Sequence, residues 1–212
     1  SNLRLKIKKD AGEEHLLWFH FRVTGAQGID CRFVIENAGQ VSYPKAWGNY
    51  RVAVSYDRDE WFRIDTTFEN GELVFEHSPE TDAIWFAYFA PYSLERHYDL
   101  IGEALCHERV RGHHLGLTLD GRDLDMLQLG TPGENKRVLW CIGRQHPGES
   151  MAEWWMEGFL DRMLDESDPL ADFILERAVI YVVPNMNPDG STRGHLRCNA
   201  GGANLNREWH EP

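Results

Sequence analysis

Basic residues are scarce in this chain of 212 residues, which holds 22 Lys and Arg against 34 Asp and Glu, for a formal net charge of −12. No run of basic residues exceeds two, as in Lys8-Lys9. Binding to nucleic acid or to an anionic membrane depends on clustered positive charge. We therefore expect neither nucleic acid nor a membrane among the partners.

Long apolar runs and closely spaced cysteines are also missing. No stretch approaches the ~20 apolar residues that span a bilayer, and the first ten residues, SNLRLKIKKD, contain no apolar signal core. The four cysteines are scattered without the spacing of a metal site, which suits free thiols in a reducing compartment. These features predict a cytoplasmic protein.

Residues 1–90 show an alternation of apolar and polar side chains with a period of two. In the first such run, Leu17, Phe19, Phe21 and Val23 alternate with Trp18 and other residues of the opposite face. Similar runs follow at 31–36, 51–56, 61–68, 73–77 and 83–89, and Asn70-Gly71 between two of them is typical of a tight hairpin. About seven short strands with turns between them predict an N-terminal antiparallel β-sandwich.

The pattern changes at Pro91, so we place a domain boundary at residue 90 and treat 91–212 as a second domain. Ser93 is expected to cap a helix with Leu94, Tyr98, Ile101 and Leu105 on its buried face. Residues 115–119 and 124–129 should pair through the turn Asp120-Gly121. His113 and His114 fall in a polar loop before this pair.

An α/β crossover unit is expected from residue 138 onward. Apolar runs at 138–142 and 179–183 predict two buried parallel strands, with helices at 150–164 and near 170–177 between them. Ser150 and Glu153 have the spacing of a capping box at the start of the first helix. The inward positions expected for that helix are Trp154, Trp155, Phe159 and Met163.

The segment RQHPGES, residues 144–150, places His146 and Glu149 in a short turn between the first of these strands and its helix. An imidazole and a carboxylate on such a turn can supply two of the three protein ligands of a catalytic zinc. An exposed loop with an unrelated His and Glu would carry the same residues. Alone, the pair is a weak signal.

The second strand ends in PNMNPDG, residues 184–190. Ligands collect at the carboxyl ends of parallel strands, so this segment should lie beside His146 and Glu149. An ordinary turn is the alternative for NPDG. Arg193, Arg197 and Arg207 follow in a glycine-rich stretch that suits a carboxylate, or equally a solvated basic loop.

HPGE, NPDG, LRC and NLNREW, in this order and on these elements, resemble the zinc metallocarboxypeptidases and, within them, the cytosolic carboxypeptidases. The segment FAYFAPYSLERHYDL, residues 86–100, is similar to the linker of that branch. The resemblance implies a β-sandwich followed by the first part of an α/β mixed-sheet metallocarboxypeptidase domain. It extends over nearly the whole chain.

The resemblance also implies roles for individual residues. His146 and Glu149 would be zinc ligands, Arg197 would polarise the scissile carbonyl, and Asn206 with Arg207 would hold the C-terminal carboxylate of a peptide or protein substrate. The family's third zinc ligand and general-base Glu are expected beyond Pro212; among the histidines here, His195 and His210 are the nearest candidates. We therefore expect the 212-residue chain to be inactive alone, and we leave a homo-oligomer open.

Two other functions remain open from the sequence. A zinc amidohydrolase of the aspartoacylase and succinylglutamate-desuccinylase type is similar at the His-Glu and Asn-Arg pairs, although the N-terminal sandwich argues against it. A fragment without catalytic activity that acts as an interaction module is an alternative from a different class. Zinc content and turnover of a peptide would separate the three.

Overall fold

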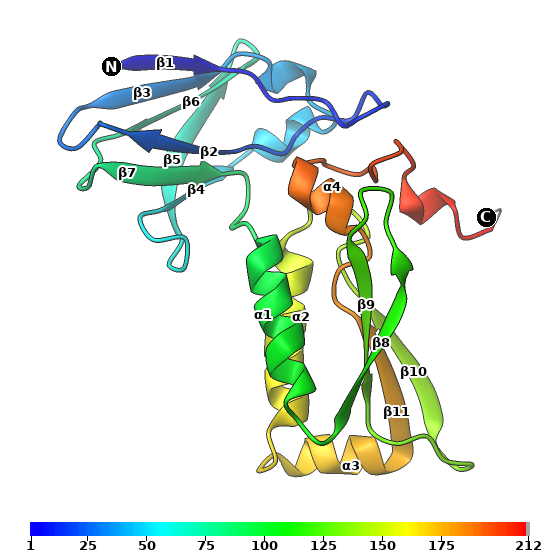
Figure 1. The fold of residues 1–212 in the computed structure, drawn as a ribbon. Helices are drawn as coiled ribbons and strands as arrows, with labels where there is room; N and C mark the ends of the chain where they lie inside the picture. The colour runs from blue at the N-terminus through cyan, green and yellow to red at the C-terminus, as the bar shows by residue number, and fades with distance from the viewer. Residues whose placement is uncertain (211–212) are drawn as a thin grey trace.

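Two β-sheets organise the chain, one in the N-terminal half (residues 1–90) and one in the C-terminal half (residues 91–210) (Figure 1). The computed structural model describes residues 1–210. The strands of the N-terminal half are β1 (Asn2–Leu5), β2 (His20–Thr24), β3 (Cys31–Ile35), β4 (Arg51–Ser55), β5 (Phe62–Glu69), β6 (Glu72–His77) and β7 (Ala83–Ala87). Two short 3₁₀ helices, η1 (Ala38–Gln40) and η2 (Pro44–Trp47), lie between β3 and β4.

The seven strands form one sheet in the order β1-β3-β6-β5-β4-β7-β2, folded into two layers. Strand β5 belongs to both layers, because its first residues pair with β4 and its last residues pair with β6. Asn70 and Gly71 join β5 to β6 with φ angles of 53° and 83°, as the two-residue hairpin requires. The predicted sandwich is confirmed, with strand β1 added to it in parallel to β3.

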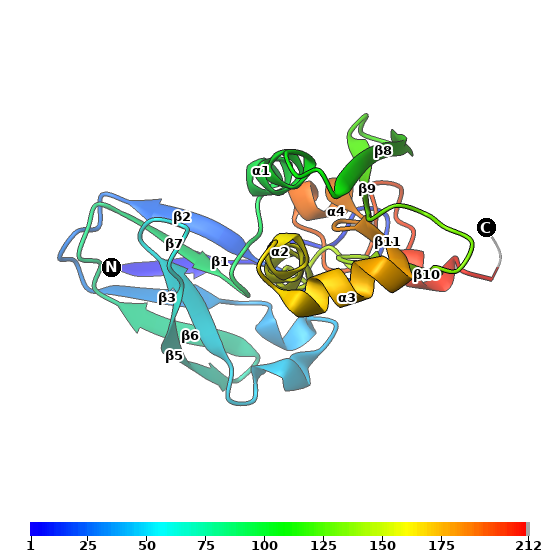
Figure 2. The same ribbon diagram turned by 90° about the horizontal axis from the view of Figure 1, so that it is seen from below.

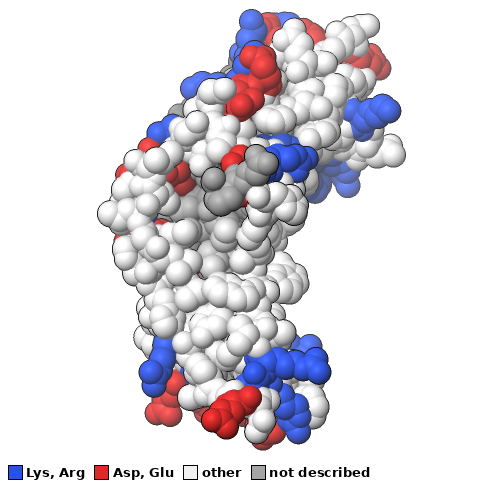
Figure 3. All heavy atoms as spheres, turned by 90° about the vertical axis from the view of Figure 1, so that its right-hand side faces the viewer, with Lys and Arg blue, Asp and Glu red and all other residues white. Residues whose placement is uncertain are grey.

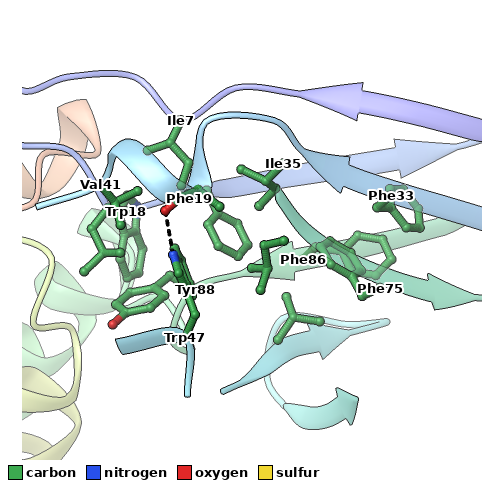
Figure 4. Close-up of a cluster of buried hydrophobic side chains, with 14 of the residues drawn as sticks. Ile7, Trp18, Phe19, Phe33, Ile35, Val41, Trp47, Phe75, Phe86 and Tyr88 are labelled. Atoms are coloured by element: carbon green, nitrogen blue, oxygen red, sulfur yellow. Dashed lines mark hydrogen bonds between the residues drawn. The ribbon is translucent and has the colours of Figure 1, made fainter. Parts of the chain in front are cut away.

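Apolar side chains from both layers fill the space between them (Figure 4). The ring of Phe33 stacks on Phe75 at a centroid distance of 5.1 Å and lies 4.6 Å from that of Phe86. Beside these rings, the backbone N–H of Tyr88 donates to the Phe19 carbonyl oxygen over 2.9 Å. The strict alternation predicted for 17–23 is wrong at Trp18, which is buried together with both of its neighbours because this segment precedes β2 and passes through the core.

The C-terminal half places a four-stranded mixed sheet against helices. Its elements are α1 (Leu94–Leu105), β8 (Val110–Leu117), β9 (Asp123–Leu129), β10 (Arg137–Ile142), α2 (Met151–Leu164), α3 (Pro169–Arg177), β11 (Ala178–Val183), α4 (Pro188–Arg193) and η3 (Leu205–Arg207). The strand order is β10-β11-β9-β8, with β10 and β11 parallel as predicted. Helices α1 and α2 lie together on one face of this sheet (Figures 1 and 2).

Helix α1 begins where the sequence predicts, because the Ser93 hydroxyl accepts a hydrogen bond from the Arg96 N–H over 3.1 Å. The predicted buried face is wrong in part. Tyr98 and Leu105 are exposed, whereas His97 and Leu100 are buried with Ile101. Because the buried face contains a histidine, hydropathy alone predicts the wrong residues for this face.

The expected capping box of helix α2 is absent. The Ser150 hydroxyl donates instead to the Ala90 carbonyl oxygen at 2.7 Å, and Trp154 Nε1 donates to the same oxygen at 3.1 Å, which ties α2 to the end of the N-terminal half. Glu153 is fully buried, whereas Trp155, predicted to point inward, is exposed. Tertiary contacts thus replace the local cap.

Strand β10 was predicted to be buried, and this is wrong for residues 1–210, since Val138, Trp140 and Ile142 are all exposed. The strand lies at the edge of the sheet and pairs only with β11 there. The predicted polar loop at 113–114 is also wrong, because both histidines belong to β8. Among residues 1–210, no helix is long and apolar enough to cross a membrane.

Candidate active site

Strands β10 and β11 end side by side, with Ile142 opposite Val183, and bring the two predicted loops together. The Met186 N–H donates to the Gly143 carbonyl oxygen at 2.9 Å, and Asn187 Nδ2 donates to the Gln145 carbonyl oxygen at 3.4 Å. The carboxyl ends of parallel strands thus meet as the sequence predicts. The site lies at this edge of the sheet.

His146 and Glu149 face each other across a single turn, with His146 Nδ1 3.1 Å from Glu149 Oε1. The imidazole is largely buried, while the Glu149 side chain is 54% exposed. Gly148 packs against Leu196, whose carbonyl oxygen would lie 3.0 Å from an added Cβ. A larger residue at 148 would push the turn away from the segment that carries Arg197.

Arg197 and Asn204 complete the surroundings of the His146 ring. Arg197 Nη1 lies 3.0 Å from His146 Nε2, and Asn204 Oδ1 lies 3.2 Å from the same nitrogen. A guanidinium only donates, so with Arg197 in this position Nε2 accepts and the ring proton is on Nδ1, toward Glu149. Sequence reasoning missed Asn204, although it stands in the same NLNR motif that drew attention to Asn206.

Asn206 and Arg207 are exposed at η3. Arg207 Nη1 donates to the Asn206 carbonyl oxygen at 3.0 Å. Within residues 1–210, no hydrogen bond joins either side chain to His146, Glu149 or Arg197. The structure therefore brings three of the five expected residues into contact. The other two lie at the edge of the site, where the Asn206 N–H donates to Asn204 Oδ1 over 3.2 Å.

The NPDG segment starts helix α4 and is more than a turn. Asn187 caps the helix by accepting from the Gly190 N–H at 3.0 Å. The buried Asp189 accepts from Thr118 Oγ1 at 2.7 Å and from Arg122 Nη1 at 2.8 Å, and thereby holds the hairpin between β8 and β9. Arg193 is paired with Asp120 of that hairpin at 2.9 Å, so its guanidinium serves the fold.

A buried charged network lies behind the His146 turn. Arg144, in the left-handed region at φ 48°, donates to the Pro147 carbonyl oxygen at 3.0 Å and pairs with Glu153. His97 Nδ1 lies 2.9 Å from the other oxygen of Glu153. Burial lowers the pKa of His97, but its hydrogen bonds with Asp125 and Glu153 outweigh burial and raise the pKa to about 9. Two cations and two carboxylates thus fix the turn to α1 and α2.

The donor set at the turn fits zinc in part. Two donors at ordinary zinc distances in a tetrahedron lie roughly 3.4 Å apart, close to the 3.1 Å between His146 Nδ1 and Glu149 Oε1. Among residues 1–210, no group of three or more His, Cys, Asp and Glu could hold a metal ion. His195 is unsuited to complete the set, because its Nε2 accepts from the Ala11 N–H and its Nδ1 donates to the Cys198 carbonyl oxygen.

A cavity of about 550 Å³ lies between the two halves, but not at this turn. Trp18, Tyr92 and Arg144 are among its lining residues, whereas His146 and Glu149 are not. The cavity therefore reaches the back of the His146 turn through Arg144. We therefore place the candidate active site at the contacts among His146, Glu149 and Arg197 and not in the cavity.

Comparison with known proteins places this arrangement in a family. The zinc carboxypeptidase model matches residues 102–212, more than half of the chain. The chain belongs to the zinc carboxypeptidase family. Residues 1–89 match the cytosolic carboxypeptidase N-terminal domain, so the chain carries the domain pair of the cytosolic carboxypeptidases, and the recognition from sequence is confirmed.

Relatives and solved structures agree with this assignment. The chain is 48% identical over its whole length to an uncharacterized protein, ZMO1242, of Zymomonas mobilis, covering 55% of that protein. It is 33% identical to human cytosolic carboxypeptidase 6, with 92% of this chain and 43% of that protein covered. The chain thus spans about half the length of these curated relatives.

Two solved structures share the fold over nearly the whole chain. A metallo-carboxypeptidase from Burkholderia cenocepacia matches with a TM-score of 0.95 at 46% identity, over 99% of this chain and 56% of that one. A metallo-carboxypeptidase from Pseudomonas aeruginosa, in complex with (2-guanidinoethylmercapto)succinic acid, matches with a TM-score of 0.96 at 43% identity, over 100% of this chain and 56% of that one. The match of residues 1–89 argues against the amidohydrolase alternative.

Proposed function

We propose that an enzyme containing this chain is a zinc-dependent metallocarboxypeptidase that hydrolyses the C-terminal peptide bond of peptides or proteins. The observation that carries the proposal is the contact of His146, on the loop after β10, with both Glu149 and Arg197, at 3.1 and 3.0 Å; Arg197 lies in the segment after α4. The proposed place of action is the cytoplasm, as the names of the cytosolic relatives suggest. We propose Ala90 as the end of the N-terminal domain.

His146 and Glu149 would hold zinc, which when bound supplies Lewis-acid polarisation of the carbonyl and acidification of the attacking water. Asn204 Oδ1, 3.2 Å from His146 Nε2, is placed to accept a hydrogen bond from a protonated Nε2, and this tautomer leaves Nδ1 free as a ligand. In that tautomer Nε2 no longer accepts from Arg197, so the guanidinium can donate to a substrate instead. We propose that the third ligand comes from outside residues 1–210 and that the 212-residue chain alone is inactive.

Arg197 would stabilise the negative charge that develops on the scissile carbonyl oxygen. Its Nε atom is buried and has no hydrogen-bond partner within residues 1–210, so the guanidinium retains donor capacity. A preorganised donor of this kind is typically worth ~3 kcal/mol in the barrier. Asn206 and Arg207 would bind the C-terminal carboxylate, because a guanidinium forms two parallel hydrogen bonds with it.

The test compares a peptide with a free C-terminus and the same peptide amidated, in an active enzyme that contains this chain. The free acid should be cleaved and the amide spared, because the amide offers no carboxylate to Arg207. Arg207→Lys should lower kcat/KM on the free acid by at least tenfold, about 1.4 kcal/mol, since an ammonium cannot form the bidentate pair. Arg177→Lys, at an exposed pair on α3, is the control. Equal turnover of acid and amide would overturn the proposal.

Metal retention tests the ligand assignment separately. His146→Ala should abolish stoichiometric zinc in that enzyme, because two remaining protein ligands hold zinc weakly. His114→Ala, at an exposed histidine of β8, should leave the zinc content unchanged. If His146→Ala kept its zinc by elemental analysis, His146 would not be a ligand.

A further inference from the structure

Asp10, in the segment between β1 and β2, reaches into the C-terminal half and holds the backbone around Arg197. Its buried carboxylate accepts hydrogen bonds from the backbone N–H groups of Leu196 at 2.6 Å, Arg197 at 2.8 Å and Cys198 at 2.9 Å. Hydrogen bonds to an ionised acceptor are among the strongest in proteins. Three such bonds, from consecutive residues, fix the position of this backbone segment relative to the N-terminal half.

The surrounding contacts seat the Asp10 segment closely on the C-terminal half. The Ala11 N–H donates to His195 Nε2 at 3.2 Å, and His195 Nδ1 in turn donates to the Cys198 carbonyl oxygen at 2.9 Å. Gly202, at φ 88°, allows the close approach, because an added Cβ would lie 3.1 Å from the Ala11 carbonyl oxygen. These contacts place the backbones of residues 10–12 and 195–202 directly against each other.

Tyr43, at the start of η2 in the N-terminal half, contacts the same residue from another side. Its ring centroid lies 5.1 Å from the Arg197 guanidinium carbon, and 44% of the residue is exposed. A guanidinium over a tyrosine ring is attracted to the ring face. The N-terminal half therefore holds Arg197 twice, by its backbone through Asp10 and by its side chain through Tyr43.

Both contacts converge on the residue whose Nη1 lies 3.0 Å from His146 Nε2. We propose that Asp10 and Tyr43 are positioning residues for Arg197, so that the N-terminal domain supplies part of the active site's geometry. The inference rests on the proposed function, in which Arg197 stabilises the developing oxyanion. It assigns the N-terminal domain a role in the chemical step itself, beyond attachment to the peptidase domain.

Steady-state kinetics of an active enzyme that contains this chain tests the proposal. Asp10→Asn and Tyr43→Leu should each lower kcat roughly tenfold with KM changed less than about threefold, because a misplaced oxyanion donor weakens transition-state binding. Tyr43→Phe keeps the ring and should retain kcat. The matched controls are Asp57→Asn, whose carboxylate accepts backbone N–H groups in a distant turn, and Tyr98→Leu, at an equally exposed tyrosine of α1.

A double-mutant cycle separates positioning from a structural role. If Asp10 and Tyr43 act through Arg197, neither substitution should lower kcat further in an Arg197→Ala background. Hydrogen exchange adds a readout independent of activity: in Asp10→Asn the amides of residues 196–198 should exchange faster, whereas Asp57→Asn should leave them protected. Full additivity with Arg197→Ala, or wild-type kcat in folded Tyr43→Leu, would overturn the inference.

The same experiment distinguishes this inference from the proposed function. If Arg197→Ala keeps wild-type kcat, the role assigned to Arg197 fails and the inference with it, whereas equal turnover of the free acid and the amide overturns the proposed function. If Arg197→Ala lowers kcat while Asp10→Asn and Tyr43→Leu do not, only the inference fails. Tyr43→Leu keeps the test decisive even if Asp10→Asn does not fold, because Tyr43 is partly exposed.

Discussion

At the scale of single residues, the chain places charge where water cannot reach it. Glu153 is fully buried and is shared by Arg144, His97 and Asn185. Its partners also touch the site, since Arg144 donates to Pro147 and Asn185 Oδ1 accepts from the Asn187 N–H at 2.8 Å. One carboxylate thus connects both loops of the active site with α1.

Glu153→Gln should therefore lower the free energy of unfolding by about 3–5 kcal/mol, because it leaves two buried cations without their shared carboxylate. Chemical denaturation of the 212-residue chain measures the change. Glu176→Gln breaks an exposed pair with Arg177 and should cost less than about 1 kcal/mol. Equal, small effects of the two substitutions would show that the network carries no stability.

At the scale of elements, His97 of α1 pairs with Glu153 of α2, and the strength of this pair depends on whether His97 is protonated. Its folded pKa of about 9 lies above its ordinary value of 6.5, so the protonated form is favoured by folding. The contribution to stability is fully present below pH 6.5 and is lost as the pH rises through 9.

The free energy of unfolding should thus fall between pH 6.5 and 9.5, by up to about 3 kcal/mol from this histidine. His97→Gln should flatten the fall, while His114→Gln, at an exposed histidine of β8, should leave it as in the wild type. Denaturant titrations at four or five pH values measure the curves. If the free energy of unfolding of His97→Gln fell as much as that of the wild type, another group would carry the pH dependence.

Glycines mark where the active-site loops touch. An added Cβ at Gly190 of α4 would lie 2.6 Å from the Cys198 carbonyl oxygen and 2.8 Å from Pro147 Cγ, whereas at Gly158 of α2 it would meet nothing within 4 Å. Gly190→Ala should cost about 1–3 kcal/mol of stability through overpacking, and Gly158→Ala should add ~0.5–1 kcal/mol because alanine favours the helix. Thermal unfolding compares the two, and a neutral Gly190→Ala would show that the loops can separate at little cost.

Sequence patterns predicted the elements well where the signal is local. The Asn70-Gly71 turn, the Ser93 cap and the parallel pair β10 and β11 all depend on neighbouring residues or a short crossover, and all are confirmed. The patterns failed where contacts with a distant segment determine the position of a side chain. Ser150 donates to Ala90 instead of capping α2, and Glu153 enters the interior because Arg144 and His97 accompany it.

The candidate site divides in the same way. His146 and Glu149 are three residues apart on one turn, so the motif alone predicts their contact. Asp10 and Tyr43 lie more than 150 residues before Arg197 in the chain. Their contacts with it depend on how the two halves dock, and no periodicity or motif in the sequence carries that information.

At the scale of the whole molecule, the two faces of the C-terminal sheet are unlike. Helices α1 and α2 cover one face, and a broad area with few charges is visible from the side of β10 (Figure 3). Val138, Trp140 and Ile142, at alternate positions of β10, are 59%, 61% and 40% exposed. Exposed apolar side chains along an edge strand are typical of an interface.

The 212-residue chain should therefore bind a hydrophobic dye or associate with itself through β10. Trp140→Lys should reduce dye fluorescence and self-association, because the charge interrupts the apolar strand. Ile29→Lys changes an exposed apolar residue of the N-terminal half, outside β10, and should leave both unchanged. Dye titration and sedimentation velocity measure the two effects. A wild-type chain that stays monomeric and does not raise the fluorescence of the dye would show that the exposed strand is no interface.

The N-terminal sheet should fold in either case, since six of its strands are linked in antiparallel pairs and its core contains only one residue, Leu196, from the C-terminal half.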